Sequence, residues 1–202
     1  MLDAIKHGLG GLLEFNGRDA RQTFWYYVLF IYILTTAISM VVILPVTIQA
    51  MFAGMKQGIE AARGQDPAVA QAAVQASMMV SMGKMIPAMM WVGVASGIIM
   101  LVGFAAAFVR RLHDSDLSGL WALLPAGCQT IGLLTIPSQM AKLQDSMQTI
   151  NFTDPMARMT MMQSSFGIGP LLSWVGIGIV IALGVRKSTP GTNRFGDGPV
   201  SC

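Results

Sequence analysis

Charged side chains are scarce in this sequence. Only 11% of its 202 residues are Asp, Glu, Lys or Arg, whereas 53% are hydrophobic. Because a water-soluble domain usually carries about 25% charged residues, the composition indicates a protein whose main solvent is a lipid bilayer. The formal net charge of +3 is too small for a nucleic-acid-binding surface, which needs a dense basic stripe. No nucleic-acid partner is therefore expected.

Cysteine is almost absent as well. One of the two cysteines, Cys128, lies in an apolar segment, and the other, Cys202, is the last residue. This spacing indicates neither a disulfide framework nor a metal-binding pattern. We expect no cofactor.

Four segments contain no charged residue and approach the length of about 20 residues that a helix needs to cross a bilayer. They cover residues 23–44, 88–109, 120–137 and 166–185. Pro45 marks the far end of the first segment or a kink in it. The third segment contains Pro125, so it either spans the membrane or enters it and returns. We predict an all-α, polytopic membrane protein with about four transmembrane helices in a single membrane domain, residues 1–202.

Further helices are expected outside these spans. Leucine and isoleucine recur near the helical period in residues 1–17, which indicates a short amphipathic helix on the membrane surface or, alternatively, a partly ordered tail. Two connections, residues 46–86 and 138–165, each contain an Asp-Pro pair typical of a helix start, Asp66-Pro67 and Asp154-Pro155. The connections should therefore contain short helices.

Lysine and arginine are distributed unevenly between the two sides of such a four-span protein. Of the 13 basic residues, eight lie before residue 22, in the loop 110–119 and in the tail 186–202, and five lie in the two long connections. The side with more positive residues normally faces the cytoplasm. We expect both termini and the loop to be cytoplasmic and the connections to be extracytoplasmic. A third segment that returned to its own side would place the tail outside instead.

Three motifs fall on the predicted cytoplasmic side. They are Gly17-Arg18-x-x-Arg21-x-x-x-Trp25, Arg110-Arg111-Leu112-His113-Asp114 with Ser118-Gly119-x-Trp121, and Gly191-Thr192-Asn193-Arg194-Phe195-Gly196-Asp197-x-Pro199. In this order they resemble a family of small bacterial inner-membrane proteins catalogued as domain of unknown function 805. The resemblance covers the chain from the N-terminus to the tail. It implies a helical protein of the bacterial inner membrane and no established activity. The long, Met-rich connections depart from the short members of that family.

The middle motif is the densest run of ionisable groups in the chain and admits two interpretations. In the first, Asp114 pairs with arginines from the other motifs and locks the helix ends together. In the second, the face binds an anion or a lipid headgroup, because an arginine fork matches phosphate and carboxylate. Adjacent helical residues point in different directions, so one of Arg110 and Arg111 could face lipid phosphate and the other the protein interior. The candidate residues for both interpretations are Arg18, Arg21, Arg110, Arg111, His113, Asp114, Ser118, Gly119, Trp121, Asn193, Arg194 and Gly196.

A hydrolase is a third interpretation of the same loop, because His113 and Asp114 precede Ser115 and Ser118. Neither serine lies in a nucleophile motif such as G-x-S-x-G. Members of a catalytic triad also converge in space and are seldom neighbours in sequence. We therefore expect no enzymatic activity.

Two classes of function are left. The favoured class is a structural or adaptor membrane protein whose cytoplasmic Arg/His/Asp face binds anionic lipid headgroups or a partner, either a second copy or another membrane protein. The alternative is an oligomeric transporter or channel for small molecules or ions, although the spans lack the ionisable groups usual in transporters. A lesser alternative is periplasmic Cu(I) binding by thioethers, although methionine more commonly fills apolar cores. The candidate copper ligands are Met78, Met79, Met82, Met159 and Met162.

Overall fold

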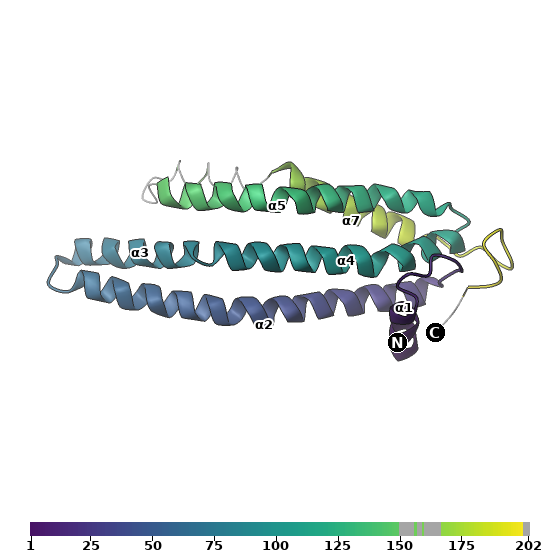
Figure 1. The fold of residues 1–202 in the computed structure, drawn as a ribbon, viewed down its shortest axis with the longest axis horizontal. Helices are drawn as coiled ribbons and strands as arrows, with labels where there is room; N and C mark the ends of the chain where they lie inside the picture. The colour runs from purple at the N-terminus through teal and green to yellow at the C-terminus, as the bar shows by residue number, and fades with distance from the viewer. Residues whose placement is uncertain (150–155, 157–158, 160–166, 200–202) are drawn as a thin grey trace. The chain divides into compact units, whose positions relative to one another are not determined.

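A computed structural model describes residues 1–149, 156, 159 and 167–199, except for the side chains of residues 78, 79, 82 and 147–149. This part of the chain is helical and contains no strand, as the sequence predicts (Figure 1). Its helices are α1 (Leu2–Gly10), α2 (Arg21–Ala62), α3 (Pro67–Gly83), α4 (Ile86–Asp114), the short 3-10 helix η1 (Gly119–Ala122), α5 (Leu123–Thr149) and α7 (Ile168–Gly184).

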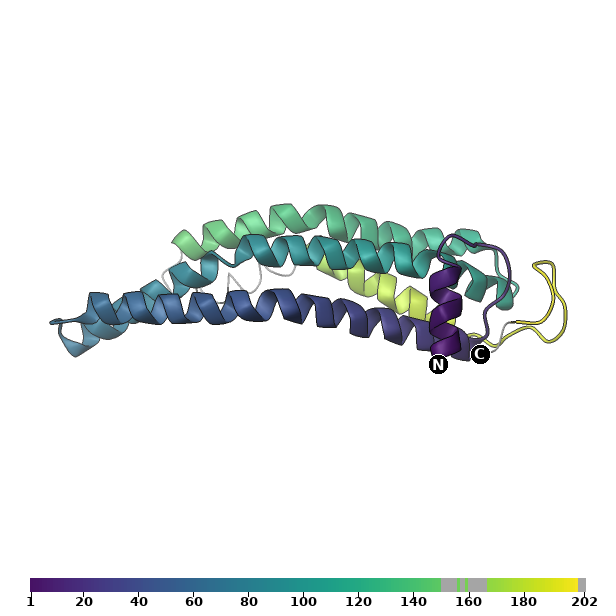
Figure 2. The ribbon, with the colours of Figure 1, turned by 60° about the horizontal axis from the view of Figure 1, so that its bottom comes forward.

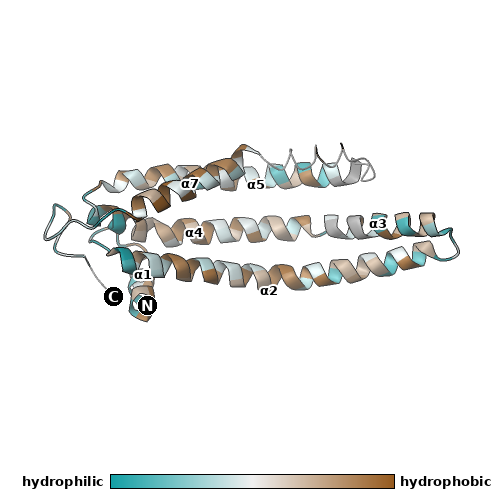
Figure 3. Ribbon diagram, turned by 180° about the vertical axis from the view of Figure 1, so that it is seen from behind, coloured by the Kyte–Doolittle hydropathy of each residue, from teal (hydrophilic) through white to brown (hydrophobic). Residues whose placement is uncertain are grey.

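Three of the described helical stretches are long and apolar enough to cross a membrane. They are α2, α4 and the stretch Gly119–Ser146, which combines η1 with most of α5. Hydrophobic residues dominate α4 and the half of α2 nearest α1, whereas hydrophilic residues gather where α2 meets α3 (Figure 3). The fourth predicted span corresponds to α7, which is apolar but has only 17 residues. The protein is therefore a helical membrane protein with at least three candidate spans.

Several helices are longer than the apolar runs that predict them. Pro45 lies inside α2, and the helix continues to Ala62, because membrane-spanning helices tolerate an internal proline. Much of the predicted connection 46–86 is consequently helical, and α3 begins at Pro67 as the Asp66-Pro67 pair predicts. The third apolar segment begins in η1 and continues in α5, which runs through Pro137. The predicted helix start at Asp154-Pro155 lies outside the described residues.

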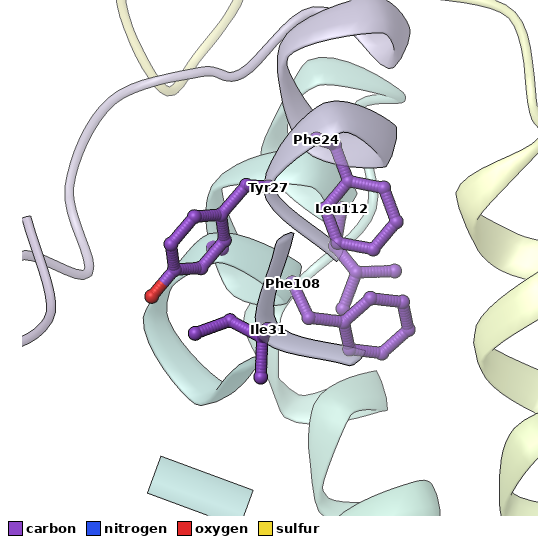
Figure 4. Close-up of a cluster of buried hydrophobic side chains, with 6 residues drawn as sticks. Phe24, Tyr27, Ile31, Phe108 and Leu112 are labelled. Atoms are coloured by element: carbon purple, nitrogen blue, oxygen red, sulfur yellow. The ribbon is translucent and has the colours of Figure 1, made fainter. Parts of the chain in front are cut away.

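The helices form two compact units, and α2, α4 and α5 each contribute to both. Unit 1 comprises Met1–Ala37, Ala95–Leu134 and Ile168–Cys202, and unit 2 comprises Ile38–Val94 and Thr135–Gly167. The core of unit 1 packs one face of α2 against one face of α4, since residues three or four apart on a helix share a face. Its buried side chains are Phe24, Tyr27, Ile31, Ala107, Phe108 and Leu112 (Figure 4).

The predicted N-terminal helix is present as α1, which crosses the start of α2 rather than running along it (Figures 1 and 2). Gly8 faces the ring of Tyr27 so closely that a Cβ there would lie 2.2 Å from a ring carbon. The helix also buries Ala4 but leaves Leu2 and Leu9 exposed. The fully buried residues of α1 are thus small, whereas two of its leucines lie at the surface.

Candidate functional site

Unit 1 buries five charged side chains where the start of α2, the end of α4 and the tail after α7 meet. These residues, called the polar cluster below, are Arg18, Asp19, Arg110, Arg111 and Asp114, each at most 3% exposed. Burying charge is costly unless the groups are paired and hydrogen-bonded. The partners of each group therefore decide what the cluster can do.

Asp114 is the centre of the polar cluster. Its Oδ1 accepts a hydrogen bond from Arg18 Nη2 at 3.1 Å, and its Oδ2 accepts one from Arg111 Nη1, one turn earlier on α4. Its backbone carbonyl accepts from both the amide nitrogen of Thr189, at 2.9 Å, and the hydroxyl of Thr189, at 2.6 Å. One aspartate therefore joins α4 to the segment before α2 and to the tail.

Arg18 binds the tail mainly through backbone carbonyls. Its Nη2 donates to the carbonyl of Thr189 at 2.7 Å, and its Nη1 donates to the carbonyls of Gly191 at 2.6 Å and Asp197 at 3.1 Å. Carbonyl oxygens carry partial negative charge, so together with the carboxylate of Asp114 they stabilise the guanidinium group. This side chain closes the tail into a loop.

Arg111 caps the end of α7. Its Nε donates to the carbonyl of Gly184, the last residue of α7, at 3.0 Å, and its Nη2 donates to the carbonyl of Arg186. The last carbonyls of a helix have no amide partner within the helix and form the negative end of its dipole. The buried guanidinium group of Arg111 donates hydrogen bonds to these carbonyls and places a positive charge at the negative end of the dipole.

Arg110 binds backbone carbonyls of the segment that follows α1. Its Nη1 donates to the carbonyls of Gly11 and Glu14, each at 2.6 Å, and its Nε donates to Asp19 Oδ2 at 2.9 Å. Asp19 Oδ1 in turn lies 2.8 Å from His7 Nε2 on α1. Arg110 and Asp19 thus fasten α1 and its following segment to the end of α4.

The burial of both α4 arginines corrects one expectation. The sequence allowed one of Arg110 and Arg111 to face lipid phosphate, but the two side chains are 3% and 0% exposed. The reason is that carbonyl groups from distant parts of the chain, at the ends of α1 and α7, converge on them. Neither guanidinium group faces outward.

The tail motif packs on the loop after α4. The Phe195 ring stacks on His113 with centroids 3.9 Å apart and planes at 8°. Asn193 Nδ2 donates to the carbonyl of His113 at 2.9 Å, and the backbones of Asn193 and Gly196 bond to each other. Gly196 has a φ of +130°, which a residue with a side chain rarely adopts. These contacts close the tail over the loop.

Arg194 forms the outer, exposed pair of this region. Its Nε lies 3.2 Å from Asp116 Oδ1, and the two side chains are 59% and 48% exposed. Its guanidinium carbon also lies 4.7 Å from the centroid of the Phe195 ring. Arg194 is therefore close to the polar cluster without being part of it.

The other sequence candidates lie around the polar cluster rather than in it. Arg21 is exposed at the first residue of α2, and Trp121 is 49% exposed. Ser118 caps η1 by accepting a hydrogen bond from the amide of Leu120 at 3.3 Å. Gly119 packs on α4, where a Cβ would lie 2.9 Å from a methyl group of Val109. These two loop residues position η1.

Sequence reasoning missed three residues of this network. Asp19 lies inside the Gly17-Arg18 motif, and its carboxylate was the available signal, because a charge between two arginines in so uncharged a chain needs a reason. His7 and Thr189 carried no signal, since their partners Asp19 and Asp114 are distant in sequence.

The groups of the hydrolase interpretation point to separate partners. Both carboxylate oxygens of Asp114 accept from arginines, the His113 ring stacks on Phe195, and Ser118 caps η1. Within the described residues, no group of three or more His, Cys, Asp or Glu could hold a metal ion. Of the candidate copper ligands, Met159 is exposed, Met162 lies outside the described residues, and the side chains of Met78, Met79 and Met82 are not described.

A protein-family model matches most of the chain. Its description is Protein of unknown function (DUF805), and it matches residues 12–197. The match includes the motif before α2, the motif at the end of α4 and most of the tail motif. No curated protein and no solved structure matches the chain.

Proposed function

We propose that this chain, which belongs to the family described as Protein of unknown function (DUF805), is a non-enzymatic structural or adaptor protein of the bacterial inner membrane. In this proposal it crosses the membrane four times, with α7 as the fourth span. Both termini lie in the cytoplasm, and the end of unit 1 that holds the polar cluster binds anionic lipid headgroups.

The observation that carries the proposal is the division of the basic residues at this end of unit 1 into two groups. Arg18, Arg110 and Arg111 are buried and bound to protein groups, so they fix the helix ends. The others are exposed, and three of these lie directly at helix ends: Arg21 begins α2, and Arg186 and Lys187 follow α7. Basic residues beside apolar spans lie at the depth of lipid phosphates. The exposed group is thus available to lipid.

The position of the buried charges favours this function over transport. A transporter usually carries ionisable groups within its spans. The buried charges of unit 1 lie at or before the end of a helix instead, as Arg18 and Asp19 precede α2, and Arg110, Arg111 and Asp114 form the last turns of α4. Such a placement suits anchoring of helix ends.

Helix α1 suits the same membrane face. It exposes Leu2, Leu9 and the following Leu13 together with Lys6. An amphipathic helix with exposed leucines and a lysine binds at the boundary between headgroups and acyl chains. Because Asp19 contacts His7 of α1 and Arg110 binds the carbonyl of Gly11 directly after it, this contact would hold the whole end of unit 1 at the headgroup level.

The lipid test compares two triple variants of equal charge. In the first, Arg21, Arg186 and Lys187 become Gln, and in the control Lys56, Lys84 and Lys142, which are also exposed, become Gln. Each basic residue near an anionic surface contributes about 1 kcal/mol, or roughly fivefold in affinity. We expect the first variant to lose retention of phosphatidylglycerol over phosphatidylcholine in native mass spectrometry, and the control to keep it. Equal loss in both variants, or none in either, would refute headgroup binding at this end.

Topology can be tested separately with reporter fusions after residues 60, 116, 150 and 202. We expect cytoplasmic signals after residues 116 and 202 and outside signals after residues 60 and 150. An outside signal after residue 116 would reverse the orientation, and an outside signal after residue 202 alone would remove α7 as a span.

A further inference from the structure

Unit 1 contains a cavity of about 330 Å³ beside the polar cluster. It lies between α4, which contributes Phe104 and Phe108, and the η1–α5 stretch, which contributes Leu123 and Ala126. Val180 of α7 and Phe15, from the segment before α2, complete its wall. The volume falls within the range typical of small-molecule sites, about 300–1,000 Å³.

The wall of the cavity is almost entirely hydrocarbon. Among its lining residues only Gln129 has a polar side chain, and none is charged. Water needs two to four polar partners to occupy a cavity, and apolar cavities stay dry or take up apolar molecules. Both α4 and the η1–α5 stretch are candidate membrane spans, so in the proposed membrane orientation lipid hydrocarbon surrounds the cavity. An acyl chain is the molecule that this wall and this medium share.

One end of the cavity is shaped by residues that the polar cluster holds in place. Arg110 binds the carbonyl of Glu14 at 2.6 Å, which fixes the residue directly before Phe15. On the other side, Gly119 lets η1 approach α4, because a Cβ there would lie 2.9 Å from Val109. Phe15 and Gly119 both line the cavity. The same arginine that fastens α1 therefore also positions one wall of the cavity.

We propose that this cavity binds one acyl chain of a membrane phospholipid, which enters from the surrounding bilayer. The chain lies against Phe104 and Ala126, and the glycerol end of the lipid leaves the cavity beside Phe15. Because the wall offers no charge, the site recognises the hydrocarbon and not the headgroup. The proposal rests on the proposed function only in placing this end of unit 1 at the headgroup level. It adds a second contact, with the lipid tail, to the contact with the phosphate.

The first test fills the cavity. Ala105 lines it, whereas Val102, on the same helix, is 50% exposed and does not. We expect Ala105→Trp to lose one tightly retained lipid in native mass spectrometry, with phosphatidylcholine and phosphatidylglycerol alike. Val102→Trp, the size-matched control, should retain it. Unchanged lipid adducts in Ala105→Trp would overturn the proposal. If the variant also lost a dimer, the occupant of the cavity would be a second copy of the chain.

The second test needs no substitution and therefore does not depend on the folding of a variant. The unaltered protein is reconstituted with phosphatidylcholine that carries a photoreactive diazirine in the middle of one acyl chain. We expect cross-links at Phe104 and Ala126 well above those at Val102. Equal labelling of all three positions would show only the general lipid contact of a membrane helix and would overturn the proposal.

The two proposals can fail separately. Substitution of the exposed basic residues should change the preference for anionic over zwitterionic lipid and leave the diazirine cross-links in place. Ala105→Trp should remove a lipid whatever its headgroup. If the triple variant kept both its preference for anionic lipid and its diazirine cross-links, headgroup binding would be refuted and the acyl-chain site would stand.

Discussion

The two compact units hold their helices together in different ways. Unit 1 joins the segment before α2, the end of α4 and the tail through buried arginines and aspartates. Unit 2 joins α2 to α3 through close backbone approach: a Cβ at Gly58 would lie 2.7 Å from the Cα of Val74. Its polar contact there is small, as Ser77 Oγ donates to the carbonyl of Gly54 at 2.9 Å.

The difference follows from which backbone groups in each unit need hydrogen-bond partners. In unit 1, the last carbonyls of α7 and the carbonyls after α1 have no helical partner, and arginine side chains reach them. In unit 2, α2 and α3 lie along each other (Figure 1), with their backbone groups already bonded inside each helix. Small residues then allow the close packing on which helix association in membranes depends. Buried charged side chains therefore join helix ends in unit 1, and small residues let α2 and α3 pack side by side in unit 2.

The largest expected effect is in the polar cluster. Asp114→Asn keeps the shape of the side chain but removes the carboxylate that Arg18 and Arg111 share. Removing one partner of a buried ion pair leaves a charge uncompensated and costs about 3–5 kcal/mol. We expect that loss in the free energy of unfolding, measured by titrating the detergent-solubilised protein with a denaturing detergent.

Asp3→Asn serves as the control, because Asp3 is exposed and the same charge is removed. It should change the free energy of unfolding by less than about 0.5 kcal/mol. A loss below about 1 kcal/mol for Asp114→Asn would mean that the carbonyl groups alone stabilise the buried arginines. Buried ion pairs would then not distinguish unit 1 from unit 2.

A smaller effect is expected where the backbones meet in unit 2. Gly58→Ala would place a methyl group 2.6 Å from Ser77 Oγ and 2.7 Å from the backbone of Val74, so the two helices must separate. Overpacking of this kind costs about 1–3 kcal/mol. The same unfolding titration measures it, and circular dichroism should show that helix content is kept.

Gly178→Ala is the matched control for Gly58→Ala. Nothing lies within 4 Å of a Cβ at Gly178, which lies inside α7 as Gly58 lies inside α2. Replacing glycine with alanine inside a helix stabilises it by roughly 0.5–1 kcal/mol. The two substitutions should therefore change stability in opposite directions. If Gly58→Ala also stabilises the protein, close backbone contact does not hold α2 to α3.

Much of the fold could be predicted because each membrane helix is specified by one continuous stretch of the sequence. An uncharged apolar run predicts a helix, and the Asp66-Pro67 pair located the start of α3. The apolar run underestimates the length of α2, because a proline that ends a helix in water is tolerated inside a membrane helix. Gly54 and Gly58 have the G-x-x-x-G spacing that lets helices approach closely in membranes, so the contact between α2 and α3 was within reach of the sequence.

The burial of the arginines could not be predicted in the same way. Sequence places Arg110 and Arg111 at the end of a span, where basic residues usually extend into water or toward phosphate. What buries them is a set of carbonyl groups about 70–100 residues away in the chain, among them those of Gly11 and Gly184. Backbone carbonyls look the same at every residue, so the sequence gives no sign of which ones an arginine will meet.

The smallest effect is expected for the exposed pair of Arg194 and Asp116, and it gives the sharpest comparison. This pair belongs to the same loop and tail as Arg18 and Asp114 but is about half exposed. Exposed ion pairs contribute about 0.2–1 kcal/mol and are screened by salt. We expect Arg194→Gln to lower the free energy of unfolding by no more than about 1 kcal/mol, and by less still at 1 M salt. Asp114→Asn should cost nearly the same at both salt concentrations, because water and ions do not reach the polar cluster. If the two variants responded equally to salt, burial would not be what separates them, and the role given to the polar cluster would be wrong.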